Sequence, residues 1–162
     1  MPDLPEMPRA PAILGPTGEA PLRVGRGGCG GRGLDTVLVV EDDPVLGALV
    51  VRVLREDGYP VAQARHGAEA LRLARQEHPA CVLLDLHLPD MDGAAFVAAF
   101  RAAGGAAGAV PIVLCTGLDA RAAARETERL GAVGFLTKPY DLDALTALVG
   151  RFAGRTYSPG TS

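Results

Sequence analysis

The sequence contains no tryptophan and only three cysteines, Cys29, Cys81 and Cys115, among its 162 residues. The cysteines show no C-x-x-C spacing and no histidine at metal-ligand spacing, which excludes a disulfide framework and argues against a zinc site. We therefore expect reduced cysteines in a cytoplasmic protein, with Cys81 and Cys115 behaving as small buried hydrophobic residues.

The sequence also lacks an excess of charge of either sign, since 16 Lys and Arg against 19 Asp and Glu residues leave a net charge of −3. Such a balance gives no general attraction to nucleic acid or to an anionic membrane, and no helix-turn-helix or other basic module is present. The chain begins with neither the basic start nor the apolar core of a secretory signal. The alanine-rich residues 93–115 are cut by Arg101, Gly104, Gly105 and Pro111 into pieces too short to span a bilayer. We expect no direct nucleic-acid binding and no membrane insertion.

Aliphatic residues are scarce in the first part of the chain. Residues 1–34 are rich in Pro, Gly and Arg, a composition that cannot offset the entropy lost on ordering, so we predict a disordered tail. Arg-Gly segments bind nucleic acid in other proteins, but this one has few arginines and no interleaved aromatic residue. A mistaken start codon is the alternative origin of this segment. We predict one domain over residues 35–153 and a short polar tail over 154–162.

Five apolar, partly β-branched runs alternate with five amphipathic segments between residues 35 and 153. The runs cover residues 36–40, 61–64, 81–85, 111–115 and 133–137, and the predicted helices cover 45–58, 68–78, 94–103, 119–130 and residues from 141 onward. On the first helix we expect one buried face, made of Leu46, Leu49, Val50, Val53 and Leu54. Strands that are apolar throughout predict an α/β fold, in which helices cover both faces of a parallel sheet.

Polar residues end or follow four of the five runs. Glu41 and Asp42 follow the first run, Asp85 ends the third, Thr116 follows the fourth and Lys138 follows the fifth. In a flavodoxin-like, doubly wound sheet of strand order 2-1-3-4-5, these ends are neighbours, so we expect the side chains to meet near the switch point between strands one and three. An isolated Asp85 would more often be a turn residue, but the other polar strand ends favour a site.

The predicted cluster has a definite chemistry. Three crowded carboxylates repel one another unless a cation compensates them, and a hard divalent ion, Mg²⁺ before Ca²⁺, fits oxygen ligands of this kind. A carboxylate can also attack phosphorus to give an aspartyl phosphate. Lys138 and the metal would then neutralise charge on the phosphoryl oxygens, and the Thr116 hydroxyl would donate a hydrogen bond to one of them.

Residues 36–153 resemble the receiver domain of two-component response regulators, of the stand-alone, single-domain type. The resemblance rests on the acid pair Glu41-Asp42, on Asp85 followed by Leu88-Pro89 and Met91-Asp92-Gly93, on Thr116 followed by the small Gly117, and on Lys138-Pro139. Each of these pieces is weak alone, but their order and spacing along the chain are specific.

The resemblance implies roles for the acidic residues. Asp85 would accept a phosphoryl group from a sensor histidine kinase or a histidine phosphotransfer protein. Mg²⁺ would be bound by Asp42, Asp85 and the main-chain oxygen of His87. Glu41 would bind the metal mainly through water.

The resemblance also implies roles for residues around the acids. Thr116 and Lys138 would hold the phosphoryl group, and the Lys138-Pro139 peptide bond would be cis. Phe135 stands where the family has its switch aromatic, and an ordinary core phenylalanine is the equally open alternative. Apart from self-catalysed phosphotransfer and dephosphorylation, such a domain is a switch rather than an enzyme. It would signal to an unidentified protein, or form a homodimer, through the face built from the fourth helix, the fifth strand and the fifth helix.

Two alternatives remain open from the sequence. A receiver fold can serve as a docking module that is never phosphorylated. A haloacid-dehalogenase-like phosphatase also uses an aspartate nucleophile and Mg²⁺, but it needs a second acid two residues later, where this sequence has His87 after Asp85. Asp90 and Asp92 have that spacing, yet they lie in a loop beyond Pro89.

Overall fold

The computed structural model describes residues 36–103 and 108–153, and the predicted tails over 1–34 and 154–162 lie outside them. The described strands are β1 (Val37–Val40), β2 (Val61–Ala64), β3 (Cys81–Asp85), β4 (Ile112–Thr116) and β5 (Gly134–Thr137). They form one parallel sheet in the order β2-β1-β3-β4-β5. The predicted doubly wound, flavodoxin-like order is thus confirmed.

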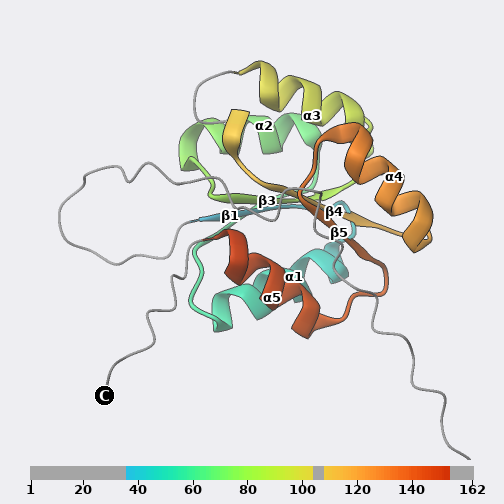
Figure 1. Cartoon of the computed structure of the whole chain (residues 1–162). Coiled ribbons are helices and arrows are strands. Elements are labelled where there is room, and N and C mark those ends of the chain that lie inside the picture. The colour runs from blue at the N-terminus through green and yellow to red at the C-terminus, as the bar shows by residue number, and fades with distance from the viewer. Residues whose placement is uncertain (1–35, 104–107, 154–162) are drawn as a thin grey trace, which may run out of the picture.

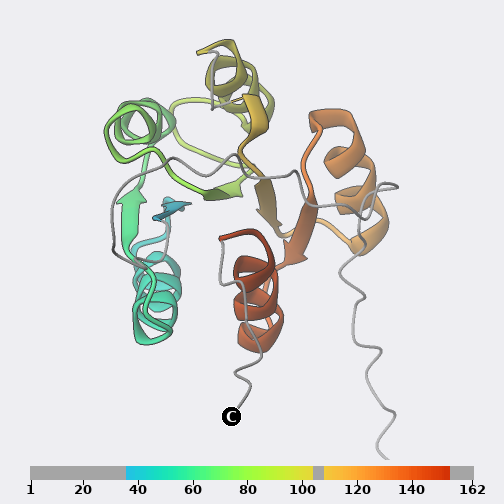
Figure 2. The ribbon, with the colours of Figure 1, turned by 60° about the vertical axis from the view of Figure 1, so that its left-hand side comes forward.

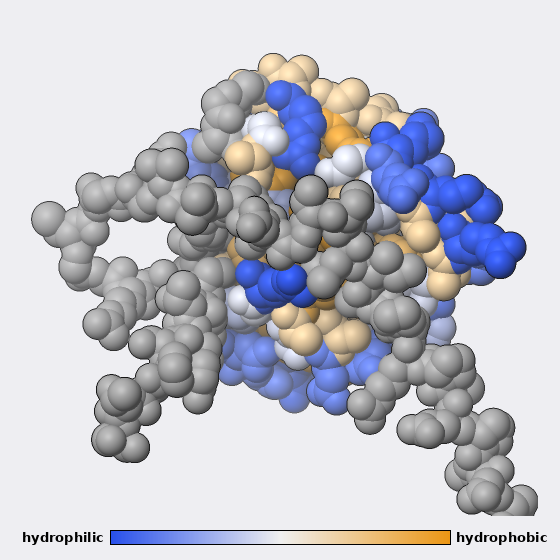
Figure 3. Space-filling view, in the orientation of Figure 1, coloured by the Kyte–Doolittle hydropathy of each residue, from blue (hydrophilic) through white to orange (hydrophobic). Residues whose placement is uncertain are grey.

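Helices cover both faces of this sheet. They are α1 (Pro44–Glu56), α2 (Gly67–Glu77), α3 (Gly93–Ala102), α4 (Ala120–Leu130) and α5 (Leu142–Phe152). Figures 1 and 2 show α1 and α5 on one face and α2, α3 and α4 on the other. In Figure 3, hydrophilic residues gather over α4, while the surface over α3 is paler because its outward residues are largely alanines. None of these helices, within residues 36–103 and 108–153, is long and apolar enough to cross a bilayer.

The strands are apolar throughout because the middle of the sheet is buried on both faces. Every residue of β1, β3 and β4 is buried. Successive residues enter opposite layers, so Val39 packs on the side of α1 and α5, and Val40 on the side of α2, α3 and α4. Phe96 of α3 is fully buried and stacks on Phe100, with ring centroids 5.8 Å apart. Burying a side chain of this size contributes roughly 1.5–3 kcal/mol to folding.

Aspartate side chains cap the N-termini of four of the described helices. Asp43, Asp92, Asp119 and Asp141 are the N-cap residues of α1, α3, α4 and α5, and each accepts hydrogen bonds from N–H groups of the first turn. The exception is α2, because its N-cap residue, His66, makes no side-chain hydrogen bond to the helix.

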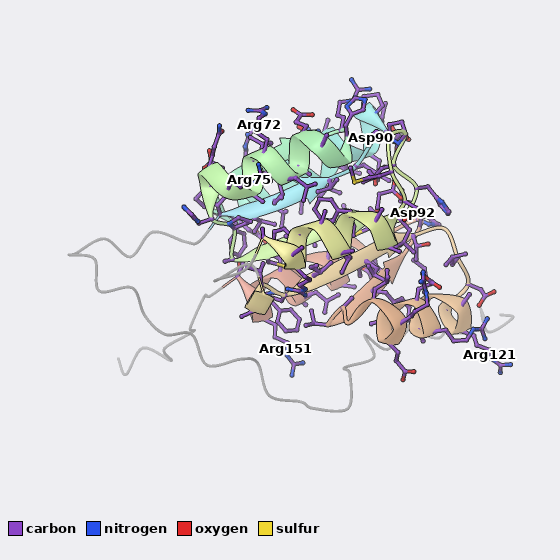
Figure 4. The ribbon with its side chains drawn as sticks, turned by 90° about the horizontal axis from the view of Figure 1, so that it is seen from above. Arg72, Arg75, Asp90, Asp92, Arg121 and Arg151 are labelled. Atoms are coloured by element: carbon purple, nitrogen blue, oxygen red, sulfur yellow. The ribbon has the colours of Figure 1, made fainter. Side chains whose placement is uncertain are left out.

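The loop after β3 supplies the missing cap of α2. Asp90 accepts hydrogen bonds from the N–H groups of Gly67 at 2.8 Å and Ala68 at 3.0 Å. Figure 4 shows Asp90 at one end of α2 and Asp92 at the adjoining end of α3. Between them, Met91 packs so closely on Gly67 that a Cβ atom at position 67 would overlap its side chain. One short loop therefore fixes the starts of two helices.

One predicted core residue of α1 is exposed. Leu49 is 43% exposed, whereas Val51, outside the predicted face, is 5% exposed. The buried face of α1 consists of Gly47, Val50, Val51 and Leu54. Gly47 belongs to it because a Cβ atom there would lie 2.8 Å from Nε2 of Gln63. Gly47, which a pattern of apolar side chains does not include, thus lies on the helix face that packs closest to the sheet. Leu49 lies on the outward face instead.

Candidate functional site

Three carboxylates meet where β1 and β3 end. Glu41 follows β1 and Asp85 is the last residue of β3, and both are 3% exposed, whereas Asp42 is half-buried. Since β1 and β3 are paired neighbours, with Val40 opposite Leu84, their carboxyl ends carry these acids to one place. One oxygen from each of the three carboxylates lies within 4.8 Å of the others.

The Lys138 side chain bridges two of these acids. Its Nζ lies 3.0 Å from Oε2 of Glu41 and 3.2 Å from Oδ2 of Asp85. The N–H of Lys138 donates to the carbonyl of Thr116 at 2.7 Å, which fixes the chain where β5 ends, and the Lys138-Pro139 peptide bond is cis. The ammonium group is thus the counter-ion of the acid cluster.

The loop that follows β3 holds the Asp85 carboxylate. The N–H of His87 donates to Oδ1 of Asp85 at 3.0 Å, while the His87 side chain is exposed. The N–H of Gly93 donates to the carbonyl of Leu86 at 3.0 Å and closes the loop. Asp85 therefore has one oxygen on a main-chain donor and the other on Lys138.

Burial and neighbouring charges move the pKa values of these groups in different directions. Burial raises the pKa of Glu41, and the nearby Asp85 adds to the increase. Burial also acts to raise the pKa of Asp85, but hydrogen bonds with His87 and Glu41 and the ammonium charge outweigh it, so this pKa lies below its ordinary value. Burial acts to lower the pKa of Lys138, but its two carboxylate partners outweigh it and raise this pKa. Of these two acids, Glu41 is therefore the more readily protonated, and Asp85 is the one that stays ionised beside the ammonium group.

Two further predicted residues lie on the neighbouring strands. Thr116 ends β4, is fully buried, and accepts a hydrogen bond at Oγ1 from the N–H of Leu118 at 3.1 Å. At the next residue, Gly117, a Cβ atom would meet nothing within 4 Å. Phe135 of β5 is 5% exposed, pairs in register with Leu114, and packs into the core layer of α2, α3 and α4. Thr116 thus stands at the strand end next to Asp85, whereas Phe135 lies within the core.

The sequence patterns missed Tyr140, which contacts this cluster, and Cys115, which contacts Tyr140. The Tyr140 hydroxyl donates to Oε2 of Glu41 at 3.3 Å, and it is also a hydrogen-bond partner of the Cys115 thiol. Burial raises the pKa of Cys115 to about 12, and burial likewise raises the pKa of Tyr140. Cys115 pairs in register with Asp85, which was a usable signal, but Tyr140 lies beyond the end of its strand.

The donor set of the cluster suits a hard divalent cation. Glu41, Asp42 and Asp85 offer oxygen ligands, which Mg²⁺ and Ca²⁺ prefer. The single ammonium group of Lys138 compensates one of the three carboxylate charges, so the pocket keeps an excess of negative charge that a divalent cation can balance. The residues present therefore fit Mg²⁺.

A family-wide profile described as the response regulator receiver domain matches residues 37–150 of this sequence. The chain belongs to this family. Receiver domains are signalling domains of two-component systems and not classical enzymes, and the predicted family membership is confirmed.

Individual relatives agree with this assignment. The chain is 38% identical over 126 residues to the transcriptional regulatory protein PrrA of Mycobacterium tuberculosis, a match that covers 78% of this chain and 53% of PrrA. It is also 38% identical over 125 residues to Protein Rrf1 of Nitratidesulfovibrio vulgaris, covering 77% of this chain and 86% of Rrf1. The chain thus spans about half the length of PrrA.

Solved receiver structures share the fold. The chemotaxis response regulator CheY4 of Vibrio cholerae superposes with a TM-score of 0.68 at 29% identity, over 74% of this chain and 98% of CheY4. The receiver domain of the sensor histidine kinase PA1611 from Pseudomonas aeruginosa superposes with a TM-score of 0.67 at 28% identity, over 74% of this chain and 98% of that one. That structure has a magnesium ion coordinated in its active-site cleft.

Proposed function

We propose that residues 35–153 form a receiver domain that is switched by Mg²⁺-dependent phosphorylation of Asp85. The phosphoryl donor would be a sensor histidine kinase or a histidine phosphotransfer protein in the cytoplasm. The observation that supports this most strongly is the state of Asp85, a buried and ionised carboxylate held by a main-chain N–H and by Lys138 beside two further acids.

In the proposed step, a carboxylate oxygen of Asp85 forms a bond to phosphorus while the bond from phosphorus to the donor's imidazole nitrogen breaks. The electron pair of that bond stays on the imidazole, which takes up a proton. Lys138, already 3.2 Å from Asp85, would neutralise charge on the phosphoryl oxygens, and the Thr116 hydroxyl would donate to one of them. Mg²⁺, when bound, supplies further positive charge there. Its proposed ligands are Asp42, Asp85 and the main-chain oxygen of His87, and Glu41 would bind it mainly through water.

Phosphorylation would act by biasing an equilibrium between two conformations. A Thr116 hydroxyl drawn to the phosphoryl group would move the end of β4, and Phe135 in the adjoining β5 would respond as the switch aromatic. The readout would be a protein, as yet unidentified, that binds one conformation better through the face of α4, β5 and α5. A second copy of this chain is one candidate.

Intact-protein mass after incubation with acetyl phosphate, with and without Mg²⁺, tests the acceptor. We expect a gain of one phosphoryl group that requires Mg²⁺ and is lost in Asp85→Asn. Asp92→Asn is the matched control, because Asp92 lies exposed in the same loop and asparagine also caps helices well. The control should be phosphorylated like the wild type.

Some receivers accept phosphate only from their own protein donor, so a beryllofluoride and Mg²⁺ binding assay accompanies the mass measurement. Binding of that phosphoryl analogue by the wild type and not by Asp85→Asn would still support the acceptor role. Failure of both assays would refute it and favour the docking module. Multiple turnover of a phosphomonoester would favour the phosphatase instead, although Asp90 already accepts two hydrogen bonds from the start of α2.

A further inference from the structure

Tyr140 touches the acid cluster in a way that the proposed phosphorylation step does not use. Its hydroxyl donates to Oε2 of Glu41 at 3.3 Å. Its side chain is partly buried and packs against the apolar layer of α1 and α5. A tyrosine anchored in this way has little torsional freedom, so its hydroxyl is presented to Glu41 in a fixed direction.

The other partners of Glu41 are a main-chain group and a side chain that it shares with Asp85. The N–H of Asp43 reaches Oε1 of Glu41 at 3.3 Å. Lys138 lies 3.2 Å from Oε1 and 3.0 Å from Oε2, but the same ammonium group also contacts Asp85. A metal ion repels that ammonium, and a phosphoryl group on Asp85 attracts it. Tyr140 is neutral and feels neither force, so it is the side-chain partner that Glu41 keeps.

The Cys115 thiol completes a chain of polar groups behind Glu41. A tyrosine hydroxyl has one proton to donate, and the Glu41 carboxylate is a stronger acceptor than a neutral sulfur atom. The Cys115 sulfur is therefore the weaker of the two acceptors beside the Tyr140 hydroxyl. This arrangement leaves the Tyr140 proton directed at Glu41.

We propose that Tyr140 is a positioning residue that holds Glu41 oriented toward Mg²⁺ while Lys138 turns to the phosphoryl group. The inference rests on the proposed function, since it assigns a role within the same metal site. Groups that orient metal ligands typically change metal affinity about 10- to 100-fold when they are lost. Glu41 would act mainly through water and the bond is long, so we expect a smaller change here, about three- to tenfold.

Isothermal titration with Mg²⁺ on the unphosphorylated full chain measures this directly. Tyr140→Phe removes only the hydroxyl, and we expect it to weaken Mg²⁺ binding about three- to tenfold. Tyr59→Phe is the matched control, because Tyr59 is 4% exposed and its hydroxyl lies near Gly150 of α5, in the apolar layer. The control should bind Mg²⁺ like the wild type.

Two further measurements separate positioning from a general structural effect. In phosphorylation by acetyl phosphate, Tyr140→Phe should raise the Mg²⁺ concentration needed for half-maximal rate and leave the maximal rate unchanged. In a Glu41→Gln background, adding Tyr140→Phe should weaken Mg²⁺ binding by much less than it does in the wild type, because the group that Tyr140 orients has been changed.

Each outcome bears on one proposal. Wild-type affinity in Tyr140→Phe overturns the positioning role, as does an equal loss in Tyr59→Phe or an undiminished loss in the Glu41→Gln background. Absence of Mg²⁺ binding by the wild type overturns the metal site itself, and this result is distinct from the other three.

Discussion

Replacing Lys138 by methionine should destabilise the protein, because it leaves two buried acids without their counter-ion. Methionine keeps most of the length and apolar character of the lysine stem, so the change isolates the charge. In the native structure the ammonium lies 3.0 Å from Glu41 and 3.2 Å from Asp85, whose side chains are each 4% exposed.

The magnitude follows from this burial. Removing one partner of a fully buried ion pair costs about 3–5 kcal/mol. The Lys138 side chain is 25% exposed, so water already weakens its interactions, and we expect a loss of about 2–3 kcal/mol in the free energy of unfolding at neutral pH. Mg²⁺ should restore much of the loss, because a metal that binds only the folded protein stabilises it by mass action.

The loss should also depend on pH with a defined sign. The raised pKa of Lys138 means that its contribution is present below about pH 10.4 and disappears as the pH rises through the higher native value. In the variant, unpaired carboxylates are relieved when they bind protons, so the penalty shrinks as the pH falls below about 4.5. The wild type and Lys138→Met should therefore differ most between about pH 5 and 9.

Urea unfolding followed by far-ultraviolet circular dichroism is the suitable assay, since the chain has no tryptophan. It should be run in EDTA and again in Mg²⁺. Arg52→Met is the matched control, because the Arg52–Glu56 pair is as short, at 3.0 Å, but its side chains are 77% and 65% exposed. The control should change stability by less than about 0.5 kcal/mol. An equally small change for Lys138→Met in EDTA would refute the reasoning.

Three further changes test the fold around the site. Phe96→Ala should cost about 3–5 kcal/mol in urea unfolding, because the ring is fully buried; a cost below about 1 kcal/mol contradicts this packing. Gly67→Ala should cost about 1–3 kcal/mol through overlap with Met91, and Met91→Ala in that background should recover part of it. Asp90→Ala should lower the melting temperature and speed amide exchange at Ala68. Hydrogen bonds from the α2 N–H groups lower the pKa of Asp90. The difference in melting temperature between the wild type and Asp90→Ala should therefore be present above about pH 3.9 and vanish as the pH falls through the lower pKa of Asp90 in the folded protein. A difference in melting temperature that persists at still lower pH would contradict the cap.

The sheet could be predicted from the sequence because its strands are short, apolar throughout and separated by recognisable helices. Buried strands carry their signal locally, in a few consecutive residues, so their alternation with helices was enough to predict a parallel sheet covered on both faces. The order β2-β1-β3-β4-β5 was expected for the flavodoxin-like form of such a sheet. The acid cluster followed from that order, because Glu41 and Asp85 occupy the ends of paired strands.

What the sequence patterns missed depends on contacts between distant residues. Asp90 caps α2 from 23 residues away, and the sequence near α2 gives no sign of it. Tyr140 reaches Glu41 only because the chain turns back after Lys138-Pro139. The prediction placed Leu49 in the core because it was based on the spacing of apolar side chains. Gly47, on the face that packs against the sheet, has no side chain and so was not considered.

The hydrogen bond between Tyr140 and Glu41 also makes the protein its own optical probe. Tyrosine emission is usually hidden by tryptophan, but this chain has none. A phenol that donates to a carboxylate emits less than one that does not, so any event that draws charge from Glu41 should change the intensity of Tyr140. Tyr59, set in the apolar layer of α1 and α5, and Tyr157, farther along the chain, would supply the rest of the tyrosine emission. Metal entry could therefore be followed in the unlabelled wild type, in real time and without substitution.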